Sequence, residues 1–280
     1  MSARLGTPCE LGGLTWERRP VDPLPGPRAL DELQDAERLH AFAALAGPAT
    51  RGPSGFRFAE SAAAEVAGRP VVLIDPLGGA RGSAAGIRAA AEHLGCDLVV
   101  LLDVGGDVLA HGDEPGLASP LADAVLLAAA PHVAASGRDV LGVIFGAGCD
   151  GELEPAEVLE RVAEVDGHGP ALGSSSLTDD EITALAAQVA RIPTEASAMA
   201  VRCAQGERGE ATIRAGRRTV QLTQAGGQLL WFDPRAALAS SARLAAAVAG
   251  AADLAEADRI LERLGVRTEL AYERDAAAAG

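Results

Sequence analysis

The chain has 280 residues, of which 48% are hydrophobic and 22% charged, and its formal net charge is −15 at pH 7. This composition excludes a disordered chain, and the apolar stretches are too short to cross a bilayer. The negative charge argues against nucleic acid or an anionic membrane as a partner, because both bind to basic protein surfaces.

Lysine does not occur in the chain, so arginine carries all of the fixed positive charge. This excludes lysine Schiff-base chemistry, a pyridoxal-phosphate anchor and a phosphate-binding loop of the Walker type. The four cysteines lack the paired spacing of a disulfide framework or a zinc site; they are Cys9, Cys96, Cys149 and Cys203. Since no signal-peptide pattern opens the chain, we expect a protein of the reducing cytoplasm.

The first part of the chain is predicted to be irregular and then helical. A short apolar run from Cys9 to Trp16 leads into a proline-rich turn over residues 20–27. Repeated prolines exclude both a helix and a central strand in that turn. A helix is predicted over about Leu30 to Leu45, and a loop rich in glycine and proline follows it through Gly55.

Strands and helices then alternate. Apolar runs typical of strands begin at Val71, Leu98 and Val140, and helices are predicted over residues 83–94, from Pro120 and from Pro155. Such alternation predicts an α/β fold with a Rossmann-like, mostly parallel sheet flanked by helices. Short right-handed crossovers would make the three strands parallel neighbours.

Beyond Gly173 the pattern changes to a small β-hairpin and helices. The predicted elements are a helix opened by the capping box Thr178 to Glu181, a hairpin of Ala211 to Arg214 with Thr219 to Thr223, a third short strand at Leu229 to Phe232, helices from Pro234 and over Leu254 to Leu264, and an extended piece at Val266 to Tyr272. We therefore expect one α/β domain over residues 1–280, with a core of about 1–175 and an extension of about 176–280.

Each strand of the alternating region ends in glycines and aspartates. Asp75 precedes Gly78 and Gly79 after the first strand; the second strand ends in Asp103, Gly105, Gly106 and Asp107; the third is followed by Asp150. Parallel strands present their carboxyl ends at one edge of a sheet, where ligands bind in open α/β folds. The sequence therefore predicts that the three endings share one crevice.

Asp103 and Asp107 are the main candidates for catalysis and for binding a divalent cation such as Mg²⁺, with Asp150 as a third metal ligand. Backbone N–H groups at Gly78, Gly79, Gly105 and Gly106 would cradle the ligand. The alternative is a set of tight turns in which the aspartates cap the next element. The same alternative holds for Asp150 and Glu152, because an Asp-Gly pair is common in turns and acidic residues favour helix starts.

Arg18 is the candidate for holding an anionic group, because a guanidinium pairs bidentately with phosphate or carboxylate. A surface arginine on a loop is the alternative. His111 is a candidate general base or a solvated loop histidine, and Cys149 is a candidate nucleophile or a small buried residue.

Several segments carry a resemblance to a known family. They are Leu11 to Arg18 with Asp22 to Arg28, Asp103 to Asp107 with Ser119 to Asp123, Gly148 to Leu153, and Pro193 to Glu195. On these segments the chain resembles domain-of-unknown-function family 1152, a group of uncharacterised bacterial and archaeal α/β proteins, over nearly its whole length. The resemblance implies an α/β fold and no established reaction. It also implies that a strand and a glycine-rich loop suited to nucleotides or phosphates would precede Met1, so the chain is expected to lack that unit or to have its start site assigned too late.

Two hypotheses about function follow. The first is a protein that binds a small anionic metabolite, phosphorylated or nucleotide-like, at the carboxyl edge of the sheet, as a metal-assisted enzyme of unknown reaction class. The second is a non-catalytic metabolite-binding or subunit protein, or a truncated and inactive homologue. Neither hypothesis involves nucleic acid or a membrane, and both are compatible with a homo-oligomer.

Overall fold

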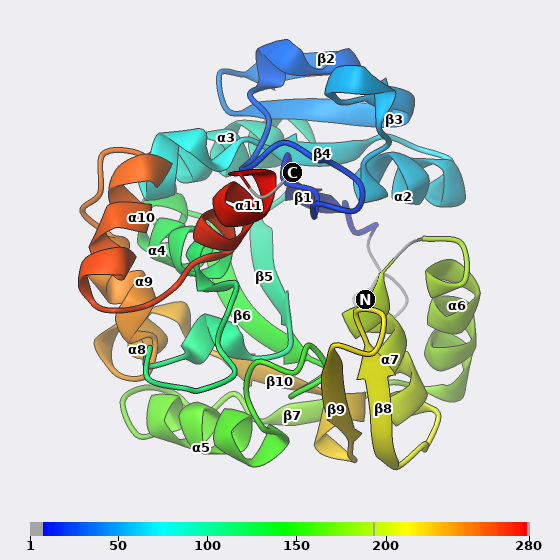
Figure 1. Cartoon of the computed structure of the whole chain (residues 1–280), viewed down its shortest axis with the longest axis vertical. Coiled ribbons are helices and arrows are strands. Elements are labelled where there is room, and N and C mark those ends of the chain that lie inside the picture. The colour runs from blue at the N-terminus through cyan, green and yellow to red at the C-terminus, as the bar shows by residue number, and fades with distance from the viewer. Residues whose placement is uncertain (1–7, 193, 279–280) are drawn as a thin grey trace.

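A computed structural model describes residues 8–192 and 194–278 of the chain and shows ten α-helices and three β-sheets in that part (Figure 1). Strands β2 (Gln34–His40) and β3 (Ala43–Arg51) lie with helix α2 (Ala59–Ala67) at the top of the view. The hairpin of β8 (Gly209–Ile213) and β9 (Arg218–Leu222) lies with α6 (Asp179–Val189) and α7 (Glu195–Ala204) at the lower right. Within the described ranges, no helix is both long enough and apolar enough to cross a membrane. Pro193 and the stretch from Met1 to Gly6 lie outside those ranges.

The first sheet has the order β1-β4-β3-β2, formed by β1 (Gly12–Leu14), β4 (Val71–Ile74), β3 (Ala43–Arg51) and β2 (Gln34–His40). Strand β1 is parallel to β4, and the other two pairings are antiparallel. The prediction of a helix over about Leu30 to Leu45 is therefore wrong. Ala43 and Leu45 are buried opposite Ile74 and Val72 of β4, and this pairing overrides the helix propensity of the alanine-rich sequence.

The second sheet has the order β5-β6-β10-β7, formed by β5 (Leu98–Val104), β6 (Asp139–Phe145), β10 (Gln228–Phe232) and β7 (Ser174–Ser176). Strands β5 and β6 are parallel and joined by α4 (Pro120–Ala134), as predicted. The strand predicted near Leu229 is confirmed, but it pairs antiparallel with β6 and β7. Residues of the predicted C-terminal extension thus complete the sheet of the core.

The sheets are mixed rather than mostly parallel. Among the described residues, two of the seven strand pairings are parallel, β1 with β4 and β5 with β6. The prediction that three consecutive strands are neighbours is wrong for β4, which belongs to the first sheet. A mainly apolar cavity of about 390 Å³ lies between the two sheets and is lined by residues of β1 and by β5 from Leu98 to Asp103.

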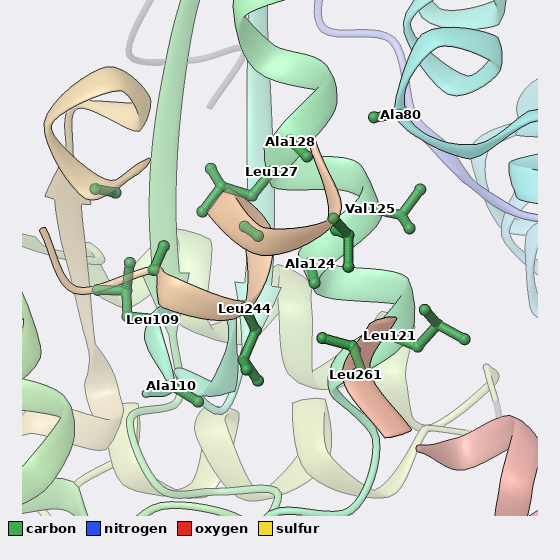
Figure 2. Packing of buried hydrophobic residues seen from close by; sticks show 14 of the residues in the cluster. Ala80, Leu109, Ala110, Leu121, Ala124, Val125, Leu127, Ala128, Leu244 and Leu261 are labelled. Carbon is green, nitrogen blue, oxygen red and sulfur yellow. The ribbon is translucent and has the colours of Figure 1, made fainter. Parts of the chain in front are cut away.

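The largest hydrophobic core surrounds α4. Helices α3 (Gly79–His93), α8 (Pro234–Ala239), α9 (Arg243–Val248) and α10 (Leu254–Arg263) pack against it. Figure 2 shows Leu121 of α4 beside Leu261 of α10, and Val125 and Leu127 further along α4. These residues and Leu244 of α9 are buried. Because α4 is apolar on most of its surface, it must be covered on most sides. The C-terminal helices α8, α9 and α10 therefore stabilise α4, the helix that connects β5 to β6.

The remaining elements match the sequence prediction in part. Confirmed are α5 (Pro155–Asp166), the capping-box helix α6 (Asp179–Val189) and the hairpin of β8 (Gly209–Ile213) with β9 (Arg218–Leu222). Helices α2 (Ala59–Ala67) and α7 (Glu195–Ala204) are additional.

The extended piece predicted at Val266 to Tyr272 is wrong, because α11 (Glu269–Ala278) occupies most of it. The hydroxyl oxygen of Thr268 accepts the N–H of Ala271, 3.2 Å away, which caps the first turn of this helix.

Candidate functional site

The turn after β5 holds two buried carboxylates. Gly105 and Gly106 have φ angles of +140° and +110°, a conformation that favours glycine. The turn lets the N–H of Gly106 donate to Oδ2 of Asp103 at 2.6 Å, and Asp107 then begins the short 3-10 helix η4 (Asp107–Leu109). Asp103 is 8% exposed and Asp107 is 6% exposed. Both side chains are thus enclosed at the carboxyl end of β5.

The loop after β6 packs directly against this turn. The N–H of Gly148 donates to the carbonyl of Gly105 at 2.8 Å. A Cβ atom placed on Gly105 would lie 2.3 Å from Cγ of Asp150, so only a glycine leaves room for that buried carboxylate. The structure confirms that Asp103, Asp107 and Asp150 come together. Their roles in catalysis and metal binding stay predictions.

Asp123 completes the group. Carboxylate oxygens of Asp103, Asp107 and Asp123 lie within 4.8 Å of one another, and the same holds for Asp107, Asp150 and Glu152. We call these five residues the carboxylate cluster. Asp123 lies in the first turn of α4 and was not among the predicted site residues. The sequence does contain an indication of it, because Asp123 is an acidic residue in the first turn of the helix that follows the Asp103 turn.

Within the cluster, Glu152 has a structural task. Its Oε2 accepts the N–H groups of Ala118 and Ser119 at 2.7 and 2.8 Å, and its Oε1 accepts the hydroxyl of Ser119. The guanidinium groups of Arg214 and Arg218 approach the same Oε1 at 3.5 and 3.7 Å. Glu152 therefore holds the start of α4 and has less capacity for a ligand than the aspartates.

The four aspartates of the cluster have raised pKa values. Burial is the largest cause for Asp103 and Asp107, whose pKa values lie well above the usual range, and the charge of Asp123 adds to it. Burial, followed by the nearby Glu152, raises the pKa values of Asp123 and Asp150 to about 7. Several carboxylates at this spacing cannot all ionise unless a cation compensates them. The cluster therefore either retains protons or binds a cation.

Positive charge faces the cluster from two directions. Arg18 follows β1, is exposed, and its charge lowers the pKa of Asp123, as expected for a guanidinium nearby. Arg214 lies in the turn between β8 and β9 with a φ of +56°. Its Nε and Nη2 atoms are buried and lack a hydrogen-bond partner among the described residues, although Nη2 lies near Glu152. Arg214 could not be predicted from the sequence, because nothing in the hairpin pattern indicates that its turn reaches the loop after β6.

The turn after β4 has a structural role in the fold. Oδ1 of Asp75 accepts the N–H of Leu77 at 2.8 Å and caps the short helix η3 (Pro76–Gly78). For Asp75 the structure therefore matches the alternative in which the aspartate caps the next element. A Cβ on Gly78 would lie 2.6 Å from the ring of Phe42, and one on Gly79 would lie 3.2 Å from the backbone of Asp253. Both glycines therefore have a packing role in the structure, and their ligand role stays a prediction.

The two other candidates from the sequence have protein partners. Nε2 of His111 lies 2.8 Å from Oε2 of Glu164, and the buried thiol of Cys149 lies beside Cys203. The cavity between the sheets is more informative, because Asp103 and Asp123 both line it. A ligand in that cavity would meet two members of the cluster.

A family model described as "Protein of unknown function (DUF1152)" matches residues 1–277. The chain belongs to the DUF1152 family. The resemblance based on the Asp103 to Asp107 and Gly148 to Leu153 motifs is thereby confirmed, and the DUF1152 match contains the whole carboxylate cluster. Comparison with curated proteins and with solved structures gave no match.

Proposed function

We propose that the protein binds a divalent cation at the carboxylate cluster and, through it, a small anionic metabolite that is phosphorylated or nucleotide-like. The observation that carries the proposal is the convergence of oxygens from the buried Asp103 and Asp107 and the half-buried Asp123 within 4.8 Å. Oxygen-only ligand sets of this kind suit Mg²⁺ or Mn²⁺. The cation would relieve the repulsion that raises the pKa values of these groups.

The position of the cluster supports a ligand beside the cation. Asp103 and Asp123 line the cavity of about 390 Å³, which is within the size range of pockets for small molecules. The arginines Arg18 and Arg214 lie near the cluster and supply the charge that an anion requires, since the chain has no lysine. In this proposal the β5-α4-β6 unit is the Rossmann-like part of the fold, and the protein acts in the cytoplasm.

Addition of Mg²⁺ or Mn²⁺ should raise the melting temperature of the protein. A cation that binds only the folded state stabilises it by about 2.7 kcal/mol at a concentration a hundredfold above Kd. The variant with Asp103→Asn and Asp107→Asn should lose this gain, because amides do not compensate the cation charge. Differential scanning fluorimetry with and without the metal measures both effects.

A matched control separates the cluster from the negative surface as a whole. Asp97 and Asp139 are exposed at the opposite ends of β5 and β6. Replacing both by Asn makes the same two substitutions at the ends of β5 and β6 far from the cluster and should leave the response to Mg²⁺ intact. An equal response in all three proteins would show that the cation does not bind at the cluster.

Among nucleotides, sugar phosphates and small carboxylates, the phosphorylated compounds should stabilise the Mg²⁺-loaded protein most. Arg18→Ala should weaken the apparent affinity by about tenfold, the size expected for one charged hydrogen bond. Arg51→Ala removes an arginine at the end of β3 in the first sheet and should have little effect. Equal losses in the two variants would contradict the role of Arg18.

Turnover that Asp103→Asn abolishes while binding persists would identify an enzyme.

A further inference from the structure

Two cysteines that are far apart in the sequence meet beneath the second sheet. Cys149 lies in the loop after β6 and Cys203 lies near the end of α7. Their Sγ atoms are 3.8 Å apart and hydrogen-bonded, and both side chains are buried. A disulfide needs about 2.05 Å between the sulfurs, so a movement of less than about 2 Å would join them.

We propose that Cys203 and Cys149 form a peroxide-reactive dithiol, in which Cys203 is the attacking thiol and Cys149 the resolving one. The assignment rests on access. Cys203 lines a cavity of about 200 Å³ together with Arg208 and Gln224, and Cys149 does not. A cavity of this volume has room for hydrogen peroxide beside Cys203.

The surroundings of Cys203 favour its thiolate. The hydrogen bond with Cys149 is the largest cause that lowers the pKa of Cys203, and the N–H of Thr223 and the charges of Arg208 and Arg202 act in the same direction. A low pKa and a nearby second cysteine are typical of oxidant-sensing thiols.

The backbone around the pair keeps the two sulfurs together. A Cβ atom on Gly226, in the 3-10 helix η5 (Ala225–Gly227), would lie 2.8 Å from Sγ of Cys203 and 3.2 Å from Sγ of Cys149. The glycine thus packs against both sulfurs and leaves no room for a side chain between them and η5. This close packing holds the thiols at reacting distance.

The reaction balances with hydrogen peroxide as the oxidant. The thiolate of Cys203 attacks one peroxide oxygen; an S–O bond forms, the O–O bond breaks, and hydroxide leaves as water after taking a proton. The sulfur of Cys149 then attacks the sulfenic acid; an S–S bond forms, the S–O bond breaks, and a second water leaves. Two thiols and one peroxide yield one disulfide and two waters. The bond would tie α7 to the loop that carries Asp150.

Trypsin offers a direct test on the full chain, because it cleaves this lysine-free protein at arginine only. Each cysteine falls in its own peptide; the peptides span residues 5–18, 89–138, 139–161 and 203–208. After treatment of the folded, reduced protein with hydrogen peroxide, we expect peptide 139–161 linked to peptide 203–208. Cys9→Ser with Cys96→Ser should leave this link unchanged.

The order of the two steps is tested with dimedone, which labels sulfenic acids. In Cys149→Ser the label should collect on Cys203, about tenfold above the label on Cys96. In Cys203→Ser, Cys149 should stay unlabelled. Oxidation confined to Cys9 and Cys96, or a link between Cys149 and Cys203 that forms only in urea, would overturn the proposal. The peptide map of the unmutated protein decides this even where a variant fails to fold.

Discussion

Without divalent cations, the protein should lose stability as the pH rises from about 5 to about 8. Asp123 and Asp150 have folded-state pKa values of about 7, whereas an unfolded Asp titrates near 4. Between these values the folded state holds protons that the unfolded state has released, so the free energy of unfolding falls as the pH rises. The loss is at most about 4 kcal/mol for each group, from about 1.4 kcal/mol per pKa unit.

Mg²⁺ should flatten this pH dependence, because the cation replaces the protons as the compensating charge. Glu60 and Glu269 have pKa values raised to about 8, mainly by burial. They too lower the free energy of unfolding as the pH rises. Their part of the slope should persist with Mg²⁺, so the portion that the metal removes reports on the cluster. Urea unfolding at pH 5 and pH 8, with Mg²⁺ or with a chelator, measures it.

The variant Asp150→Asn tests whether the cluster causes this pH dependence. It should reduce the pH-dependent loss seen without metal, whereas the pair Asp97→Asn and Asp139→Asn should not. A slope that Mg²⁺ leaves unchanged, or that Asp150→Asn leaves unchanged, would contradict a coupled cluster in which cation and protons compete.

Gly105→Ala should destabilise the protein strongly and remove the response to Mg²⁺. The substitution places a Cβ atom 2.3 Å from Cγ of Asp150, at a position whose φ of +140° already disfavours a side chain. The Asp150 carboxylate is short, buried and bonded to the N–H of Glu152 at 3.2 Å, so it cannot turn aside without loss. Positive φ alone costs on the order of 1–3 kcal/mol, and the contact adds to that.

Gly137→Ala is the matched control for Gly105→Ala. Gly137 also has a positive φ, +86°, but a Cβ atom there would meet nothing within 4 Å. This variant should show only the backbone cost and keep the full gain from Mg²⁺. Thermal unfolding of both variants with and without the metal gives the comparison; similar losses in the two would mean that the Gly105 contact with Asp150 is unimportant.

Local sequence patterns were enough to predict those parts of the protein that depend on neighbouring residues. Continuous apolar runs ending in glycine and aspartate predicted β5 and β6 and the turns after them, because strand-end turns with positive φ require glycine. The capping box at Thr178 predicted the start of α6 for the same local reason. The convergence of Asp103, Asp107 and Asp150 followed from the parallel direction of two strands joined by a helix.

Features that depend on residues far apart in the sequence became visible only in the folded chain. The segment over Leu30 to Leu45 became part of a β-hairpin because β3 pairs with β4. No local sequence pattern indicates that β4 lies beside this segment. Asp123 and Arg214 joined the site because α4 and the β8-β9 turn pack against the ends of β5 and β6. Cys149 and Cys203 lie 54 residues apart and meet only when α7 packs beneath the sheet. Charge, hydrogen bonding and sulfur contacts of this kind arise from packing, so they cannot be derived from periodicity along the chain.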